Sequence, residues 1–292
     1  MKKYEYWLNS NSIDEKEAVE KIMEKVIIRG CILLSVFLGS WFLLQQVNWI
    51  GFFNINPLLR NEYVNKIEVK LGELMYDDFT SRYSVVNDDL AVATIDTIVT
   101  KICEANNINR KELKVYLLES EEVNAFALPN HQLMIYTGLA KKTSTPEALA
   151  GVIGHELAHI QKDHVMQSLV REIGLGTLFT IISGGDFSMV SEIGRMVSST
   201  AFSRNLEKEA DLVGLTYIQN AQIDPKPFAE FIGVIHDDKD KDLPSAFKWV
   251  STHPFPEDRK EYLLQNIQKE KREYKPVLSA DTWKNFQEFL KD

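Results

Sequence analysis

The chain has 292 residues, of which 45% are hydrophobic and 26% are charged, an ordinary composition for one large or two small globular domains. Its formal net charge of -9, without a basic stretch to neutralise phosphates, argues against a nucleic-acid partner. The two cysteines, Cys31 and Cys103, indicate neither a disulfide framework nor a thiolate metal site. Any metal would therefore be held by histidine and carboxylate side chains.

An apolar segment lies close to the N-terminus. Residues 1–25 are polar and charge-dense, and we expect them to form a cytoplasmic N-terminal segment. The fifteen residues 30–44 carry no charge, and the apolar pattern extends over 26–53. A bilayer is spanned by about 20 predominantly apolar residues. The segment 26–53 is therefore predicted to be an uncleaved transmembrane signal anchor.

Other interpretations of this segment fit less well. A buried helix of a soluble domain is the main alternative, because the uncharged run is shorter than a usual span. A cleaved signal peptide is disfavoured by the long charged region before the run and by the lack of a small-residue cleavage site after it. Six lysine or arginine residues precede the run and three follow it shortly, which predicts a cytoplasmic N-terminus. We expect a single-pass protein of the cell inner membrane, with its large C-terminal part facing the periplasm or exterior.

The rest of the chain alternates helical and extended patterns. Apolar spacing predicts a helix over 88–105, and alternation predicts strands at Lys114–Leu118 and Gln132–Tyr136. An apolar stretch at 173–182 is too short to span a bilayer, so we expect it in the core or at a membrane surface. The remaining predicted elements are a helix over 203–220, a charged loop at 239–242, a helix from Asp258 and a C-terminal tail at 276–292.

A strong helix start precedes the motif that carries the chemistry. Thr145 can cap the helix, Pro146 suits its first position, and an acid follows. On this helix His155 and His159 are four residues apart, so both imidazoles can reach one metal ion at about 2.0 to 2.1 Å. Glu156 lies about 100° further round, where it can take a proton from a zinc-bound water. A chance match is disfavoured by the helix start. The motif therefore predicts zinc-dependent hydrolysis.

Two histidines leave a catalytic zinc one protein ligand short. His164 follows the motif too closely, half a turn away from the face of the first histidine, and is not favoured. Glu207 and Asp211 are four apart on one face of a predicted helix. One carboxylate can bind the metal while the other accepts the spare N–H of a ligating histidine. Such a pair is usually surface charge, and the need for a third ligand is what singles it out; Glu209 is expected to be solvated.

Four blocks resemble a known family, in the family's order: Val123–Pro129, Gly154–Ile160, Ser203–Asp211, and Ser251-Thr252-His253-Pro254 with Arg259. The chain resembles the gluzincin metalloendopeptidases of the HtpX and BepA type, a family that includes the CAAX prenyl proteases and the mitochondrial inner-membrane Oma peptidase. The resemblance covers roughly residues 70 to 265. It implies an α+β fold, a mainly helical zincin-like metallopeptidase domain at 65–275 with a small β-sheet beside the active-site helix, preceded here by one transmembrane helix.

The resemblance also implies roles for individual residues. Glu207 would be the third ligand of one Zn2+ per subunit, with Asp211 as the partner of His155. His253 resembles the family's histidine near the zinc, which stabilises the oxyanion or occupies the open coordination position. The edge strand beside the cleft matches Asn124, Ala125, Phe126 and Ala127, where an extended substrate adds by backbone hydrogen bonding. Asn130-His131 replaces a Gly-Gly of the family, and we interpret His131 as a turn residue.

The sequence thus predicts a membrane-anchored zinc metalloendopeptidase. From the family, its substrates would be unfolded or damaged envelope proteins, and a single dedicated substrate remains open. A function of another class is a low-turnover, zinc-stabilised chaperone-like or binding module at the membrane, which would require an obstructed cleft. Loss of Glu156 discriminates the two, because only the protease depends on that carboxylate.

Overall fold

The computed structural model describes residues 23, 25, 27–37, 39, 62–184, 187–199, 202–238, 249, 253, 259–268 and 272–291. The chain divides into two compact units, Met1–Arg60 and Asn61–Asp292. In the first unit Ile27–Phe37 is a short apolar helix whose large side chains are exposed. Most of the predicted N-terminal segment 1–25 and of the predicted anchor 26–53 lies outside the described residues.

The second unit is mainly helical with one small sheet. Its elements are α3 (Glu62–Arg82), α4 (Asp89–Ala105), η1 (Arg110–Glu112), β1 (Lys114–Leu118), β2 (Ala125–Leu128), β3 (Gln132–Tyr136), α5 (Thr137–Lys142), α6 (Pro146–Gln161), α7 (His164–Glu172), α8 (Leu175–Gly184), α9 (Phe187–Ser199), α10 (Arg204–Asn220), α11 (Lys226–Asp238), α13 (Arg259–Gln268) and α14 (Ala280–Phe289). The predicted helix over 88–105 is confirmed, with the side chain of Asp88 capping it by accepting the N–H of Ala91 at 2.9 Å.

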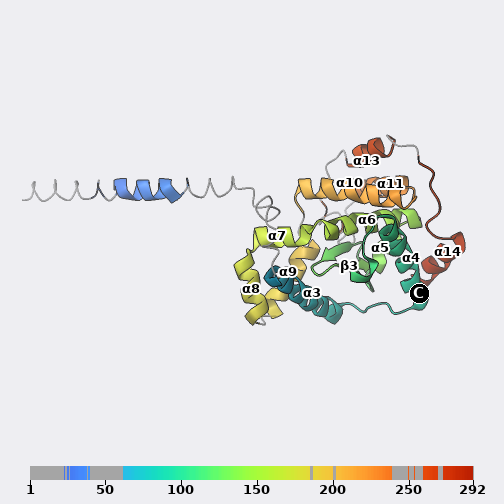
Figure 1. The fold of residues 1–292 in the computed structure, drawn as a ribbon, viewed down its shortest axis with the longest axis horizontal. Coiled ribbons are helices and arrows are strands. Elements are labelled where there is room, and N and C mark those ends of the chain that lie inside the picture. Colours follow the sequence, from blue (N-terminus) through green and yellow to red (C-terminus); the bar gives the residue numbers. More distant parts are fainter. Residues whose placement is uncertain are drawn as a thin grey trace, which may run out of the picture. The chain divides into compact units, whose positions relative to one another are not determined.

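Helix α6 lies at the centre of this unit. It begins as predicted, with Thr145 Oγ1 accepting the N–H of Ala148 at 3.1 Å and Pro146 in the first turn. Helices α10 and α11 lie on one side of α6 and the sheet lies on the other (Figure 1). Every residue from Ala148 to Ile160 is buried. A helix covered on all sides is apolar all round, and between Ala148 and Ile160 the polar residues are those of the motif.

The sheet has three strands among the described residues, in the order β1-β3-β2. Both predicted strands, β1 and β3, are present and run parallel, while β2 is antiparallel to β3 and lies at an edge. Pro129, Asn130 and His131 connect β2 to β3, and the last two have φ angles of 64° and 53°. Two consecutive positive φ values are typical of the tight hairpin turn that matches the strand twist. His131 is therefore a turn residue, as predicted.

Two glycines bring α6 and α10 into backbone contact. A Cβ atom on Gly214 would lie 2.8 Å from both N and Cα of His155, and one on Gly154 would lie 2.9 Å from a side-chain carbon of Ile218. Neither position has room for a larger residue. The close crossing places the two helices so that the motif of α6 faces the carboxylates of α10.

The chain reverses after the motif. Asp163 takes a left-handed conformation, with φ of 56°, between the end of α6 and the start of α7. No single helix among the described residues is both long and apolar enough to cross a bilayer. Helices α7 and α8 reach the length and apolar composition of a membrane span only when they are taken as a pair, and the chain bends by 95° between them. The predicted apolar stretch at 173–182 corresponds to α8, with Leu178 and Ile181 buried.

The C-terminal residues differ from the predicted tail at 276–292. They include α14, whose Phe286 is fully buried and which packs against α4. The side chain of Ser279 caps this helix through the N–H of Thr282 at 3.1 Å, and Gln287 donates to the carbonyl of Ala140 at 2.8 Å. A capped amphipathic helix with one buried aromatic is sufficient to fix this segment to the domain. The predicted charged loop at 239–242 lies outside the described residues.

Candidate active site

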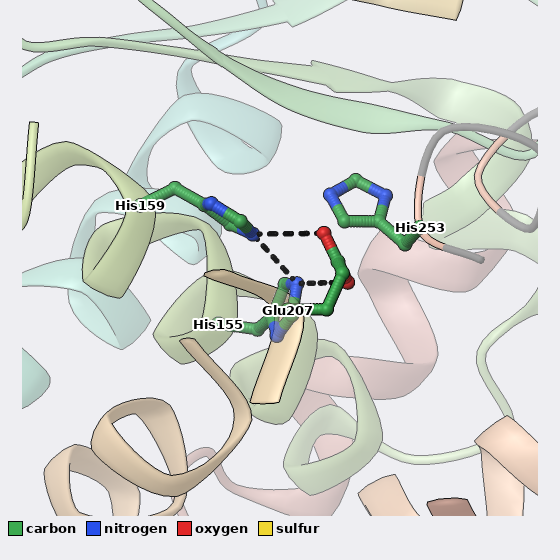
Figure 2. A group of neighbouring side chains, drawn as sticks. All are labelled: His155, His159, Glu207 and His253. Atoms are coloured by element: carbon green, nitrogen blue, oxygen red, sulfur yellow. Dashed lines mark hydrogen bonds and ion pairs between the residues drawn. The ribbon is translucent and has the colours of Figure 1, made fainter. Parts of the chain in front are cut away.

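Four buried side chains converge between α6 and α10. They are His155, His159, Glu207 and His253, and their donor atoms all lie within 4.8 Å of one another. Figure 2 shows the two imidazoles of α6 and the carboxylate of α10 pointing at one another, with His253 beside them. The structure therefore brings together the residues that the motif and the resemblance selected as metal ligands.

The spacing of the donor atoms matches what a tetrahedral metal ion needs. The Nε2 atoms of His155 and His159 are 3.0 Å apart, and they lie 3.6 and 3.5 Å from the two carboxylate oxygens of Glu207. Ligands at about 2.0 to 2.1 Å from a tetrahedral ion are separated from one another by about 3.3 Å. Two imidazoles and one carboxylate can thus hold an ion such as zinc and leave one coordination position for water or substrate.

Burying the Glu207 carboxylate without hydrogen-bond donors destabilises the fold unless a bound cation neutralises its charge. Both oxygens of Glu207 are buried and accept no hydrogen bond from any described residue. Burial raises the pKa of Glu207 to about 7 and lowers the pKa of His159 to about 3, because a low-polarity environment disfavours charge. It also holds the pKa of His155 well below its usual range. Neutral imidazoles are the form that binds a metal, and a bound cation would favour the ionised form of the carboxylate.

Asp211 lies on the other side of His155 from the cluster. Its Oδ1 is 3.0 Å from Nδ1 of His155, so it accepts the imidazole N–H and leaves Nε2 free to face the metal position. The guanidinium of Arg259 donates two hydrogen bonds to Asp211, and the hydroxyl of Tyr262 donates a third. Arg259 also approaches His155 Nδ1 at 3.3 Å, but with that nitrogen protonated the contact is not a hydrogen bond. Asp211 is thus held in one orientation by residues of α13.

Glu156 lies beside the cluster and is fully buried. The indole N–H of Trp249 donates to its Oε1 at 3.0 Å, and Nε2 of His253 lies 3.4 Å from the same oxygen. Burial raises the pKa of Glu156 to about 8, and the hydrogen bond from Trp249 acts against this rise. A carboxylate with a raised pKa next to a metal position has the proton affinity that a general base requires.

The predicted substrate strand lies next to Glu156. Asn124, Ala125, Phe126 and Ala127 are buried, and the last three belong to β2 at the edge of the sheet. The carbonyl of Asn124 accepts the N–H of Tyr136 in β3. Because strand backbone groups alternate in direction, those of Ala125 and Ala127 point to the free edge. The N–H of Ala127 lies close enough to Glu156 to lower its pKa.

Several residues of the site were missed by the sequence reasoning. Trp249 reaches Glu156 from 93 residues further along the chain, and no local spacing links it to α6. Arg259 was part of the fourth block of the resemblance, but its contact with Asp211 was not predicted. Phe202 stacks on the ring of His159, with centroids 4.2 Å apart. Glu209 is exposed, as expected, and its carboxylate also lies 3.1 Å from Lys162 and 3.6 Å from His164. Ser251, Thr252 and Pro254 of the fourth block lie outside the described residues.

Comparison with known proteins agrees with this geometry. The sequence model of peptidase family M48 matches residues 90–267. The metalloendopeptidase OMA1, mitochondrial, of Bos taurus is 26% identical over 219 residues, which are 66% of this chain and 41% of that protein. Its Homo sapiens counterpart is 24% identical over 287 residues, 88% of this chain and 53% of that protein. The beta-barrel assembly-enhancing protease of Escherichia coli (strain K12) is 21% identical over 206 residues, with 66% and 42% covered. The chain spans about half the length of these relatives.

Proposed function

Because the chain belongs to peptidase family M48, we propose that it is a zinc metalloendopeptidase that hydrolyses polypeptides. The observation that carries this proposal is the arrangement of His155, His159 and Glu207, whose donor atoms are spaced for a tetrahedral ion, with Glu156 beside them. Under this proposal the three residues are the ligands and Asp211 orients His155. A bound zinc would polarise the scissile carbonyl and lower the pKa of the attacking water.

The chain's own residues then supply the proton transfers. Glu156 accepts a proton from the attacking water at its carboxylate and passes it to the leaving amine. His253 donates from Nδ1 to the carbonyl of Trp249 at 3.1 Å, so its neutral ring presents the lone pair of Nε2. This nitrogen lies 3.4 Å from Glu156 and could occupy the open coordination position of the metal, whereas only the protonated ring could donate to an oxyanion. Trp249 holds one oxygen of Glu156 by its indole N–H, which fixes the direction of the carboxylate.

The edge of β2 offers a way to bind an extended polypeptide. The outward backbone groups of Ala125 and the carbonyl of Ala127 can pair with a substrate strand, whereas the N–H of Ala127 is directed at Glu156. The outward carbonyl of Val123 already accepts the N–H of Trp249 at 3.1 Å. Pairing through the backbone gives affinity without demanding particular side chains, which suits unfolded substrates.

We further propose that residues 26–53 anchor the protein in the cell inner membrane, with the protease domain facing the periplasm or exterior. The uncharged run at 30–44 and the exposed apolar side chains of Ile27–Phe37 support this. Damaged or unfolded envelope proteins are the proposed substrates, in line with a relative named beta-barrel assembly-enhancing protease. Attaching a reporter enzyme that is active only outside the cytoplasm after residue 60 would test the orientation; activity of that fusion supports it, and inactivity refutes it.

The catalytic proposal is tested by Glu156→Gln in the full-length protein. The amide cannot accept the proton, so cleavage of unfolded casein should fall by about 10²-fold or more, while bound zinc stays at one ion per chain. A control, Lys208→Gln, changes an exposed residue on α10 and should cleave like the unchanged protein. Undiminished cleavage by Glu156→Gln would refute the mechanism. Proteins that accumulate with this variant in cells would then be candidate substrates.

One observation favours the second candidate, a low-turnover zinc-stabilised binding module. Both histidines of the motif, Glu156 and His253 are fully buried. The indole N–H of Trp249 is hydrogen-bonded to Glu156. In this arrangement a polypeptide substrate has no access to these side chains. A binding module would keep its cellular function when Glu156 is replaced by Gln. Complementation of a deletion strain by that variant would therefore favour the binding module over the protease.

A further inference from the structure

His164 is buried next to the cluster without belonging to it. Its side chain is 1% exposed, and its Nδ1 lies 3.0 Å from Nδ1 of His159. His159 turns its other nitrogen, Nε2, toward His155 and Glu207 (Figure 2). The contact between His159 and His164 is therefore on the edge of the His159 ring that faces away from the metal position.

The positions of the protons follow from this geometry. A histidine that binds a metal through Nε2 offers a lone pair there, so its Nδ1 carries the hydrogen and donates. Nδ1 of His164 must then accept, which places the hydrogen of His164 on Nε2. That nitrogen lies 3.6 Å from Oε2 of Glu209. The distance exceeds a well-formed hydrogen bond, but the carboxylate still attracts an N–H in this place more than a lone pair.

The two histidines of the motif are thus held by different groups. His155 donates to the carboxylate of Asp211 at 3.0 Å, whereas His159 donates to a neutral imidazole. The ring of Phe202 stacks on His159 with centroids 4.2 Å apart and an interplanar angle of 22°. Phe202 limits tilting of the His159 ring, but an apolar face cannot distinguish its two nitrogens. Among the described residues, His164 is the hydrogen-bond partner at Nδ1 of His159, and its acceptor there selects the tautomer that leaves Nε2 facing the metal position.

We propose that His164 is a positioning residue that fixes the tautomer and ring orientation of His159, and that Glu209 in turn fixes the tautomer of His164. This rests on the proposed role of His159 as a metal ligand. The left-handed turn at Asp163 makes the contact possible, since it begins a new helix at His164 and returns its side chain to the end of α6. A partially exposed carboxylate is thereby linked to a fully buried metal ligand through one intervening ring.

The test compares two replacements of His164 in the full-length protein. In His164→Asn the amide oxygen can occupy the place of Nδ1 and accept from His159, whereas His164→Phe keeps a ring but has no acceptor. Zinc affinity, measured by competition with a chromophoric chelator, should fall about 10- to 100-fold for Phe and only a few-fold for Asn. The visible absorption spectrum with Co2+ should change for Phe and be retained for Asn. Equal affinities and spectra for both variants would overturn the proposal.

Glu209 provides a second pair of variants that is safe for folding, because its side chain is 45% exposed. Glu209→Gln and Glu209→Met lose the same charge, but only Gln keeps an acceptor for His164. Zinc affinity about two- to fivefold weaker for Met than for Gln supports the link, and equal affinities refute it. Failure of the proposed function looks different: the unchanged protein would then bind no stoichiometric zinc, and His159→Ala would bind as the unchanged protein does.

Discussion

Replacing Gly214 by Ala should disturb the metal position without touching a ligand. The new Cβ would lie 2.8 Å from N and Cα of His155, where ordinary contacts begin at 3.4 Å, so α10 must move from α6 by about 0.6 Å. Overpacking of this kind costs about 1 to 3 kcal/mol. Protein metal sites tolerate changes in ligand distance of about 0.2 Å. Since Glu207 lies on α10 and the histidines lie on α6, zinc affinity should fall at least about tenfold.

The matched control is Gly176→Ala in α8, where a Cβ would meet nothing within 4 Å. Each variant replaces a helical glycine by alanine, and this replacement by itself stabilises a helix by up to about 1 kcal/mol. The difference between the two variants therefore isolates the packing term. We expect Gly214→Ala to be less stable than Gly176→Ala by about 1 to 3 kcal/mol in urea unfolding of the metal-free protein. Equal stability with equal zinc affinity would refute the argument that this crossing sets the ligand geometry.

Two further predictions concern Glu156 and the C-terminal helix. Trp249→Phe removes the N–H that stabilises the ionised form of Glu156, so the pKa of Glu156 should rise. The acidic limb of the pH profile of kcat/KM should therefore move to higher pH. An acidic limb that stays in place or moves to lower pH would contradict this. Phe286→Ala should lower the free energy of unfolding by about 3 to 5 kcal/mol in urea titrations, because the side chain is fully buried. Lys284→Ala, which changes an exposed residue of the same helix, should alter the free energy of unfolding little. Similar values for the two variants would mean that α14 does not unfold together with the domain.

Helix-capping residues and the alternation of apolar residues predicted several helices and strands correctly from short stretches of sequence. Thr145 and Pro146 marked the start of α6, and alternating apolar residues marked β1 and β3. The predicted third ligand came from chemical need, since zinc requires more than the two histidines of the motif. The transmembrane anchor at 26–53 stays a prediction, because most of it lies outside the described residues.

The contacts around the site depend on tertiary packing that spacing does not encode. The argument against His164 assumed one continuous helix, but the left-handed turn at Asp163 ends α6 and returns His164 to His159. Arg259 meets Asp211 from 48 positions further along the chain, where no periodicity connects them. Residues 276–292 were predicted as a C-terminal tail, but Phe286 of α14 is fully buried, and Trp283 and Phe289 pack against the core beside it.

The long separation of Arg259 from α6 and α10 has a consequence for biosynthesis. As the chain leaves the ribosome, the motif histidines and Glu207 emerge first and can pack as soon as α10 is complete. Asp211 is then buried without the guanidinium that later holds it, and Glu156 is without its indole donor. The half-made site is poorly organised for hydrolysis until α13 docks. The order in which these residues are synthesised therefore delays completion of the site until the C-terminal part of the domain has been made.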